Sequence, residues 1–147
     1  QQGTRSSGIT EGCMEYVRGY LNVPLIRHTK TTYKSNDQEV IVVCLVSKGR
    51  DTGNRTEYWF GLRKKQKKSL EACKKQYLAF ACGSANKIIL VPDTVFRGWL
   101  ADMSISHKMQ GTEHWNIVII EDKGKYTLRL RSGTENVDLT GYFLAAQ

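Results

Sequence analysis

The sequence lacks any apolar run long enough to cross a membrane. The longest, residues 40–46, has seven residues, whereas a transmembrane helix needs about 20. No signal peptide or lipidation motif is recognisable either. We therefore expect a cytoplasmic protein that has no membrane partner.

The sequence also lacks the usual signatures of cofactor binding and nucleophilic catalysis. There is no G-x-G-x-x-G fingerprint and no Walker loop to hold a nucleotide cofactor. His28, His107 and His114 are scattered, and no serine or cysteine lies in a nucleophile elbow or a Cys–His arrangement. We expect no small-molecule cofactor and no catalytic residues of these classes.

Zinc-binding spacings are missing as well. The four cysteines form no C-x-x-C pair and no Cys/His pair at zinc-ligand spacing; they are Cys13, Cys44, Cys73 and Cys82. Cys44 belongs to the apolar run, and Cys73 lies on the inward side of a predicted helix. We expect all four to be small core residues of a reduced protein, with no metal site.

What the sequence has is one domain's length and an excess of positive charge. It contains 147 residues, of which 40% are hydrophobic and 24% charged, a composition typical of a globular domain. The net charge of +8 indicates an anionic partner, of which nucleic acid is the commonest. Residues 1–8 are interpreted as a linker or cloning remnant, and residues 9–147 as a single domain excised from a larger protein.

The periodicity of the sequence predicts an α+β domain. Its sheet is expected to be mixed and mostly antiparallel, with two or three short helices. Residues 39–47 are apolar on both alternations, so this strand is expected to be central in the sheet. The expected helices are residues 11–21, capped by Thr10, a basic helix after residue 62, and a short helix capped by Asp93. The other expected elements are a polar connector at 27–37, strands at 55–62, 77–82 and 87–91, a hairpin formed by 115–121 and 126–131, and a hydrophobic ending at 137–145.

The most informative stretch is residues 58–76, where an aromatic triplet runs into a cluster of cations. The stretch has one acid and carries a net charge of +6; its cations are Arg63, Lys64, Lys65, Lys67, Lys68, Lys74 and Lys75. An inward stripe indicates a helix and consists of Gln66, Leu70, Cys73 and Tyr77. Because crowded like charges repel, the outward lysines favour an anionic partner. The alternative is a solvated surface helix.

A second basic pattern lies in the predicted hairpin. Arg129 and Arg131 alternate with apolar residues, so they are expected side by side on the outer face, about 7 Å apart. Arginine is the preferred donor to phosphate oxygens and guanine edges. These two side chains are therefore further DNA-binding candidates, although ordinary surface decoration remains the alternative.

The aromatic triplet must divide between the two faces of its strand. Trp59 lies opposite Tyr58 and Phe60, and the sequence does not decide which face is the core. Whichever of Tyr58 and Trp59 is exposed could stack on an unstacked base, an interaction of about 1–3 kcal/mol.

One short match points to an enzyme. Pro92-Asp93 followed by Glu121-Asp122-Lys123 resembles the motif of the PD-(D/E)XK nucleases. The resemblance implies that Asp93 and Glu121 would hold Mg²⁺ and that Lys123 would help to activate water. It covers five residues and does not extend further along the chain.

Taken together, these patterns predict a DNA-binding module that is not itself catalytic. We expect a targeting or recognition domain of a bacterial restriction, nuclease or mobile-element system. Duplex DNA and the other domains of the parent chain are its expected partners, and RNA remains open. The alternatives are a metal-dependent nuclease using Asp93, Glu121 and Lys123, and a protein-interaction domain for an acidic partner.

Overall fold

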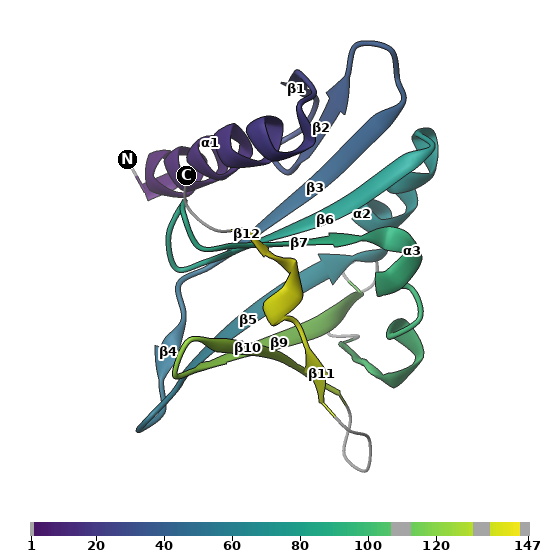
Figure 1. Cartoon of the computed structure of the whole chain (residues 1–147). Helices are drawn as coiled ribbons and strands as arrows, with labels where there is room; N and C mark the ends of the chain where they lie inside the picture. Colours follow the sequence, from purple (N-terminus) through teal and green to yellow (C-terminus); the bar gives the residue numbers. More distant parts are fainter. Residues whose placement is uncertain (1, 107–112, 131–135, 145–147) are drawn as a thin grey trace.

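The computed structural model describes residues 2–106, 113–130 and 136–144, and it has three layers. Helix α1 covers one face of a mixed sheet A, and the other face of sheet A packs on an antiparallel sheet B (Figure 1). The predicted α+β class is confirmed. The strands divide between two sheets that enclose the main core.

The strand order of sheet A is β1-β2-β3-β6-β7-β12, and that of sheet B is β11-β10-β9-β5-β4, with β8 paired to β9. The strands of sheet A are β1 (Leu25–Arg27), β2 (Thr32–Ser35), β3 (Val40–Ser47), β6 (Lys75–Cys82), β7 (Ile88–Pro92) and β12 (Phe143–Leu144). Those of sheet B are β4 (Arg50–Asp51), β5 (Thr56–Arg63), β8 (Ser104–Ser106), β9 (His114–Asp122), β10 (Lys125–Arg129) and β11 (Val137–Asp138). The helices are α1 (Gln2–Leu21), α2 (Lys64–Ser69) and α3 (Asp93–Phe96), with 3₁₀ turns η1 (Leu70–Ala72), η2 (Leu100–Asp102) and η3 (Thr140–Tyr142).

Strand β3 is buried on both faces, as predicted from its apolar alternations. Ile41 and Val43 point into the core between the sheets, whereas Val42 and Cys44 point toward α1. On its two edges β3 pairs with β2, which is antiparallel, and with β6, which is parallel over the whole length of β3. It is therefore an internal strand, buried on both faces over residues 40–45.

Helix α1 is longer at its start than the sequence indicated. It begins at Gln2, so Thr10 lies inside the helix and the predicted cap is wrong. The buried face was predicted correctly: Met14 and Val17 are fully buried against sheet A. Within the described residues, no helix has the length and apolar character needed to span a membrane.

The prediction of a polar connector at residues 27–37 is wrong, because this segment contains β2. Tyr33 of β2 is fully buried, and its hydroxyl donates a hydrogen bond to Glu11 Oε2 of α1 at 2.7 Å. One buried aromatic and the backbone ladder to β3 therefore hold a segment that is otherwise polar.

The basic helix is shorter than predicted. Helix α2 ends at Ser69 and tightens into the 3₁₀ turn η1, after which Cys73 is already extended. Leu70 and Cys73 are buried as predicted. Lys75, however, opens β6, and Tyr77 lies in that strand and not on the helical stripe. The parallel pairing of β6 with β3 explains the early end, because the chain must enter sheet A beside residue 40.

The predicted hairpin is confirmed, and the predicted cap at Asp93 is wrong. Lys123 and Gly124 join β9 to β10 with φ values of 52° and 79°. Two successive positive φ values define the type I′ turn, which matches the twist of antiparallel strands. Asp93 is the first residue of α3 and its carboxylate makes no capping hydrogen bond, since Pro92 occupies the cap position.

Candidate nucleic-acid interface

The seven cations of residues 63–75 gather at one end of the two-sheet core. They lie at the end of β5, on α2, on the turn that follows it and at the start of β6. Six of them are exposed: Arg63, Lys64, Lys65, Lys68, Lys74 and Lys75. Two hydrogen bonds fix α2 in place. The Arg63 backbone N–H donates to Gln66 Oε1 at 2.8 Å, and Gln66 Nε2 donates to Thr31 Oγ1 at 3.1 Å. With Leu70 buried beneath, this end is a rigid basic surface, called the basic end below.

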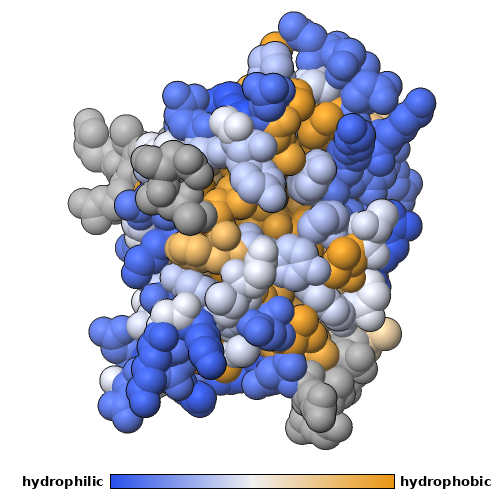
Figure 2. Space-filling model, in the orientation of Figure 1, coloured by the Kyte–Doolittle hydropathy of each residue, from blue (hydrophilic) through white to orange (hydrophobic). Residues whose placement is uncertain are grey.

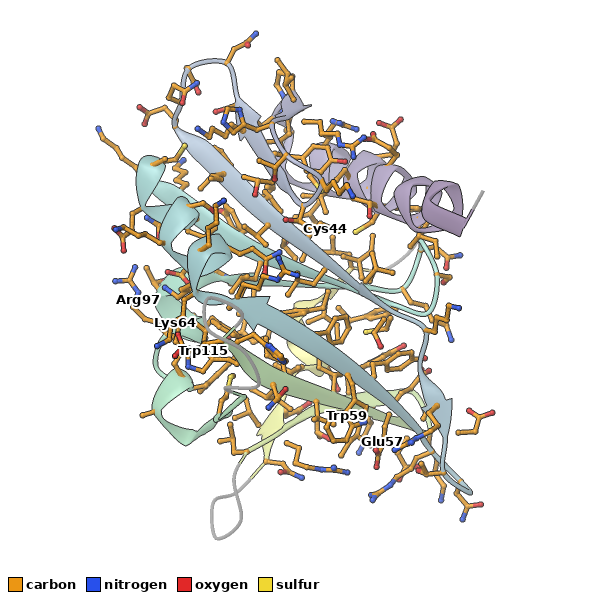
Figure 3. All side chains as sticks on the ribbon, turned by 180° about the vertical axis from the view of Figure 1, so that it is seen from behind. Cys44, Glu57, Trp59, Lys64, Arg97 and Trp115 are labelled. Atoms are coloured by element: carbon orange, nitrogen blue, oxygen red, sulfur yellow. The ribbon has the colours of Figure 1, made fainter. Side chains whose placement is uncertain are left out.

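Among the seven cations of residues 63–75, all of them described, Lys67 alone turns inward. Its Nζ lies 3.1 Å from Oδ2 of Asp93, a carboxylate only 1% exposed. The Nε of Arg97 lies 3.6 Å from the same oxygen, and the Arg97 side chain is 56% exposed. Lys67 therefore balances a buried charge. Arg97, which the sequence analysis missed, joins Lys64 at the basic end (Figure 3).

Lys64 has an acidic partner at the surface. Its Nζ lies 3.8 Å from Glu113 Oε1, and both side chains are about half exposed. Exposed pairs of this kind stabilise a protein by only about 0–1 kcal/mol. Lys64 can therefore exchange Glu113 for a stronger anion at little cost.

Tyr58 and Trp59 lie on opposite faces of β5, as the alternation of side chains along a strand requires. Tyr58 is buried, and its hydroxyl donates to Glu121 Oε1 at 2.8 Å. Burial, with Glu121 as a second cause, raises the pKa of Tyr58 well above its ordinary value. Trp59 points to the opposite, outer face of sheet B and is 50% exposed. Only Trp59 is therefore accessible for stacking.

Glu57 links Trp59 to Arg129 on that outer face. Trp59 Nε1 donates to Glu57 Oε1 at 3.2 Å, and Arg129 Nη2 donates to Glu57 Oε2 at 2.8 Å. The hydrogen bond from Arg129 is the main cause that lowers the pKa of Glu57, and that from Trp59 is the second. The sequence analysis missed Glu57, although its position two residues before Trp59 puts both on one face.

The outer face of sheet B continues from Trp59 to the basic end. Arg63 lies on the same face four residues farther along β5, about 13 Å away at the rise of a strand. In the ladder of β5 and β9, Arg63 lies opposite His114. The His114 ring packs over Gly61 on this face, where its nearest atom would be 3.1 Å from a Cβ placed on that glycine. Arg131, the other arginine predicted to bind DNA, lies outside the described residues.

Beside Trp59 the surface forms a shallow depression of about 450 Å³. It is lined by Ser47, Lys48, Gly49, Arg50, Glu57 and Trp59. The Trp59 backbone N–H donates to Ser47 Oγ at 3.1 Å, which fastens this part of β5 to the end of β3. The depression therefore combines an aromatic wall with two cations.

The three residues of the nuclease motif do not come together. Glu121 pairs with Thr56 at the start of β5, whereas Asp93 binds Lys67, which lies beyond the end of β5. An eight-residue strand spans roughly 23 Å, which is too far for two carboxylates to share a metal ion. Lys123 is exposed in the hairpin turn. In the described part of the chain, no three His, Cys, Asp or Glu side chains are grouped so that they could hold a metal.

Comparisons of the chain with protein family models, with curated proteins and with solved structures gave no match.

Proposed function

We propose that this chain is a DNA-binding module whose basic end contacts the phosphate backbone. The observation that carries the proposal is the group of exposed cations at that end. Among the described residues, no ion pair or hydrogen bond occupies the charged group of Arg63, Lys65, Lys68, Lys74 or Lys75. Every one of these charges is free to meet an external anion.

The rigidity of the basic end favours a repetitive, rigid anion. Arg63 to Lys65 form the junction between β5 and α2, and the hydrogen bonds of Gln66 and the burial of Leu70 hold that junction. The backbone positions from which the cationic side chains extend are therefore set before binding, which lowers the entropic cost of contacting a phosphate backbone. Each neutralised phosphate also releases condensed counterions, which strengthens binding.

The salt dependence of duplex binding tests the proposal. The slope of log affinity against log salt falls by about 0.9 for each phosphate contact. The double variant Lys65→Ala/Lys68→Ala should therefore flatten the slope by about 1.8 and weaken all duplex sequences about equally. Both side chains are exposed, so the melting temperature should stay within about 2 °C.

The matched control also removes two positive charges, at the end of β9 that lies away from the basic end. Lys123 and Lys125 are exposed at the β9–β10 turn, and the double variant Lys123→Ala/Lys125→Ala should leave the slope nearly unchanged. An equal effect in both variants would show that overall charge, and not the basic end, attracts DNA. Absence of duplex binding at low salt would overturn the proposal as a whole.

A further inference from the structure

The outer face of sheet B carries a second feature that phosphate contacts do not explain. We propose that Trp59 and the depression beside it bind one unpaired nucleotide, with the base stacked on the indole and its phosphate held by Lys48 and Arg50. This inference rests on the proposed DNA-binding function and names the DNA structure that the module would select.

Trp59 is exposed and at the same time fixed in orientation. Half of its surface meets solvent, yet its indole N–H is held by Glu57 and its backbone N–H by Ser47. Glu57 is itself held by Arg129 at 2.8 Å, so Glu57 and Arg129 orient the ring and Ser47 fixes the backbone that carries it. An exposed aromatic ring held in this way is preorganised to stack, because little side-chain entropy is lost when a ligand binds.

The chemistry of the depression matches a nucleotide. A nucleotide combines a flat π-system with an anion, and this site combines an indole face with the cations Lys48 and Arg50. Arg50 lies opposite Glu57 in the ladder of β4 and β5, so it stands on the same face as Trp59. The volume of about 450 Å³ lies in the range of small-ligand sites.

The base must be unpaired to reach this site. Bases in a duplex are stacked on their neighbours, and an enzyme or binding protein reaches the face of one only if it is single-stranded or extruded. Trp59 and Glu57 lie along β5 from the basic end, where Lys64 and Arg97 are found (Figure 3). The interval of about 13 Å from Trp59 to Arg63 equals roughly four nucleotide steps of 3.4 Å. One strand could therefore place a base at Trp59 while its phosphates cross the outer face toward Arg63.

Three labelled probes of one sequence test the inference: a fully paired 20-mer duplex, the same duplex with a single unpaired thymine, and the single strand. The wild-type protein should prefer the two probes with unpaired bases. Trp59→Ala should weaken binding to those two by about 5- to 150-fold, the range expected for loss of one stacked base, and leave the paired duplex within about 2-fold. Trp59→Phe keeps an aromatic face and should recover part of the loss. Trp59 fluorescence, taken as the wild-type signal less that of Trp59→Phe, should be quenched by the unpaired probes only.

The proposed contacts of Lys48 and Arg50 with the phosphate are tested separately, through the salt dependence of binding. On the single strand, Lys48→Ala/Arg50→Ala should flatten the salt slope by about 0.7, the value for one neutralised phosphate. The slope on the paired duplex should not change. Because all three side chains are exposed, a retained melting temperature verifies that each variant folds.

The outcomes separate this inference from the function on which it rests. Salt-dependent duplex binding with no preference for unpaired bases, or with no effect of Trp59→Ala, overturns the nucleotide site and leaves the DNA-binding module standing. Equal losses on all three probes also overturn it, because Trp59 would then belong to the general duplex surface. Failure of every probe to bind overturns both.

Discussion

The two sheets differ in how many of their faces are covered. Sheet A has α1 on one face and sheet B on the other, whereas among the described residues no helix covers the outer face of sheet B (Figure 1). The side chains follow this difference. The long strands β3, β6 and β7 of sheet A contain one charged residue, Lys75, at the very start of β6. On the outer face of sheet B, β5 carries Glu57 and Arg63 and β10 carries Lys125 and Arg129, whereas the middle of β9 presents Val118 and Ile120.

This contrast indicates where function can reside. A side chain on the long strands β3, β6 and β7 is committed to packing, since a polar group without a partner is costly to bury there. The outer face of sheet B is free to hold Glu57, Trp59 and Arg129 in a hydrogen-bonded row. Figure 2 shows the molecule from the side opposite to that of Figure 3. Hydrophobic residues lie near the centre of this view, over β7, η3 and β12, and hydrophilic residues lie toward the edges. The candidate interface therefore lies on sheet B and on the basic end that β5 leads into.

The largest expected effect on stability comes from comparing two single substitutions, one that places a carboxylate on sheet A and one that places it on sheet B. Val42 of β3 is fully buried under α1, and Val118 of β9 is 6% exposed on the outer face. Val42→Asp should abolish folding, because the new carboxylate would be buried without a partner. Val118→Asp should cost only about 1–2 kcal/mol, since Arg129 is its direct neighbour across the ladder and can share its guanidinium between Glu57 and the new carboxylate. Circular dichroism and thermal melting measure both effects.

Equal damage from the two substitutions would break the comparison. It would mean that something covers the outer face of sheet B as completely as α1 covers sheet A. The candidate interface would then have to be sought elsewhere on the chain.

The sequence predicted the covered regions better than the partly covered ones. Residues 40–47 are apolar at both alternations, which fits only a strand buried on both sides, and the Lys123-Gly124 turn has a known geometry. Strand β2 was missed because it has a single buried apolar side chain, Tyr33, among polar residues. The basic helix was extended too far because lysine spacing does not distinguish a helix end from the start of β6.

The candidate site was predicted in part for similar reasons. Cations at the basic end could be counted from the sequence, but the inward turn of Lys67 depends on Asp93, 26 residues later. Three consecutive aromatics left the orientation of β5 undecided until Tyr58 was seen to be buried. Glu57 and Arg129 are 72 residues apart, and no local pattern indicates that they meet.

A smaller effect should separate two neighbours on β5. Tyr58→Phe removes the hydroxyl that bonds to Glu121, a carboxylate that also lies 3.7 Å from Lys87. Because Glu121 keeps Lys87, we expect a loss of about 1 kcal/mol, seen as a fall of about 3 °C in melting temperature. Trp59→Phe, on the solvent face, should change stability by less than about 0.5 kcal/mol. A larger loss from Trp59→Phe would contradict the assignment of the two faces.

The smallest effect should appear when Glu57 loses its charge. The hydrogen bonds from Arg129 and Trp59 lower the pKa of Glu57 in the folded protein, so its carboxylate contributes stability at pH values above the unfolded pKa of about 4.3. That contribution is lost as the pH falls through the lower folded value. Glu57→Gln should therefore melt about 1–2 °C below the wild type at pH 7.

The difference between the two proteins should shrink as the pH falls below the unfolded pKa of about 4.3, and it should be lost once the pH passes the lower folded value, where the wild type also becomes neutral at this position. Asp37 and Asp138 also have lowered pKa values, mainly through hydrogen bonds from Ser35 and from the Thr140 backbone. Both proteins should thus lose stability in acid, and only their difference reports on Glu57. A difference that does not vary with pH would show that the amide disturbs packing around Trp59. A difference that vanishes in acid would mean that charge on the uncovered face of sheet B orients the indole.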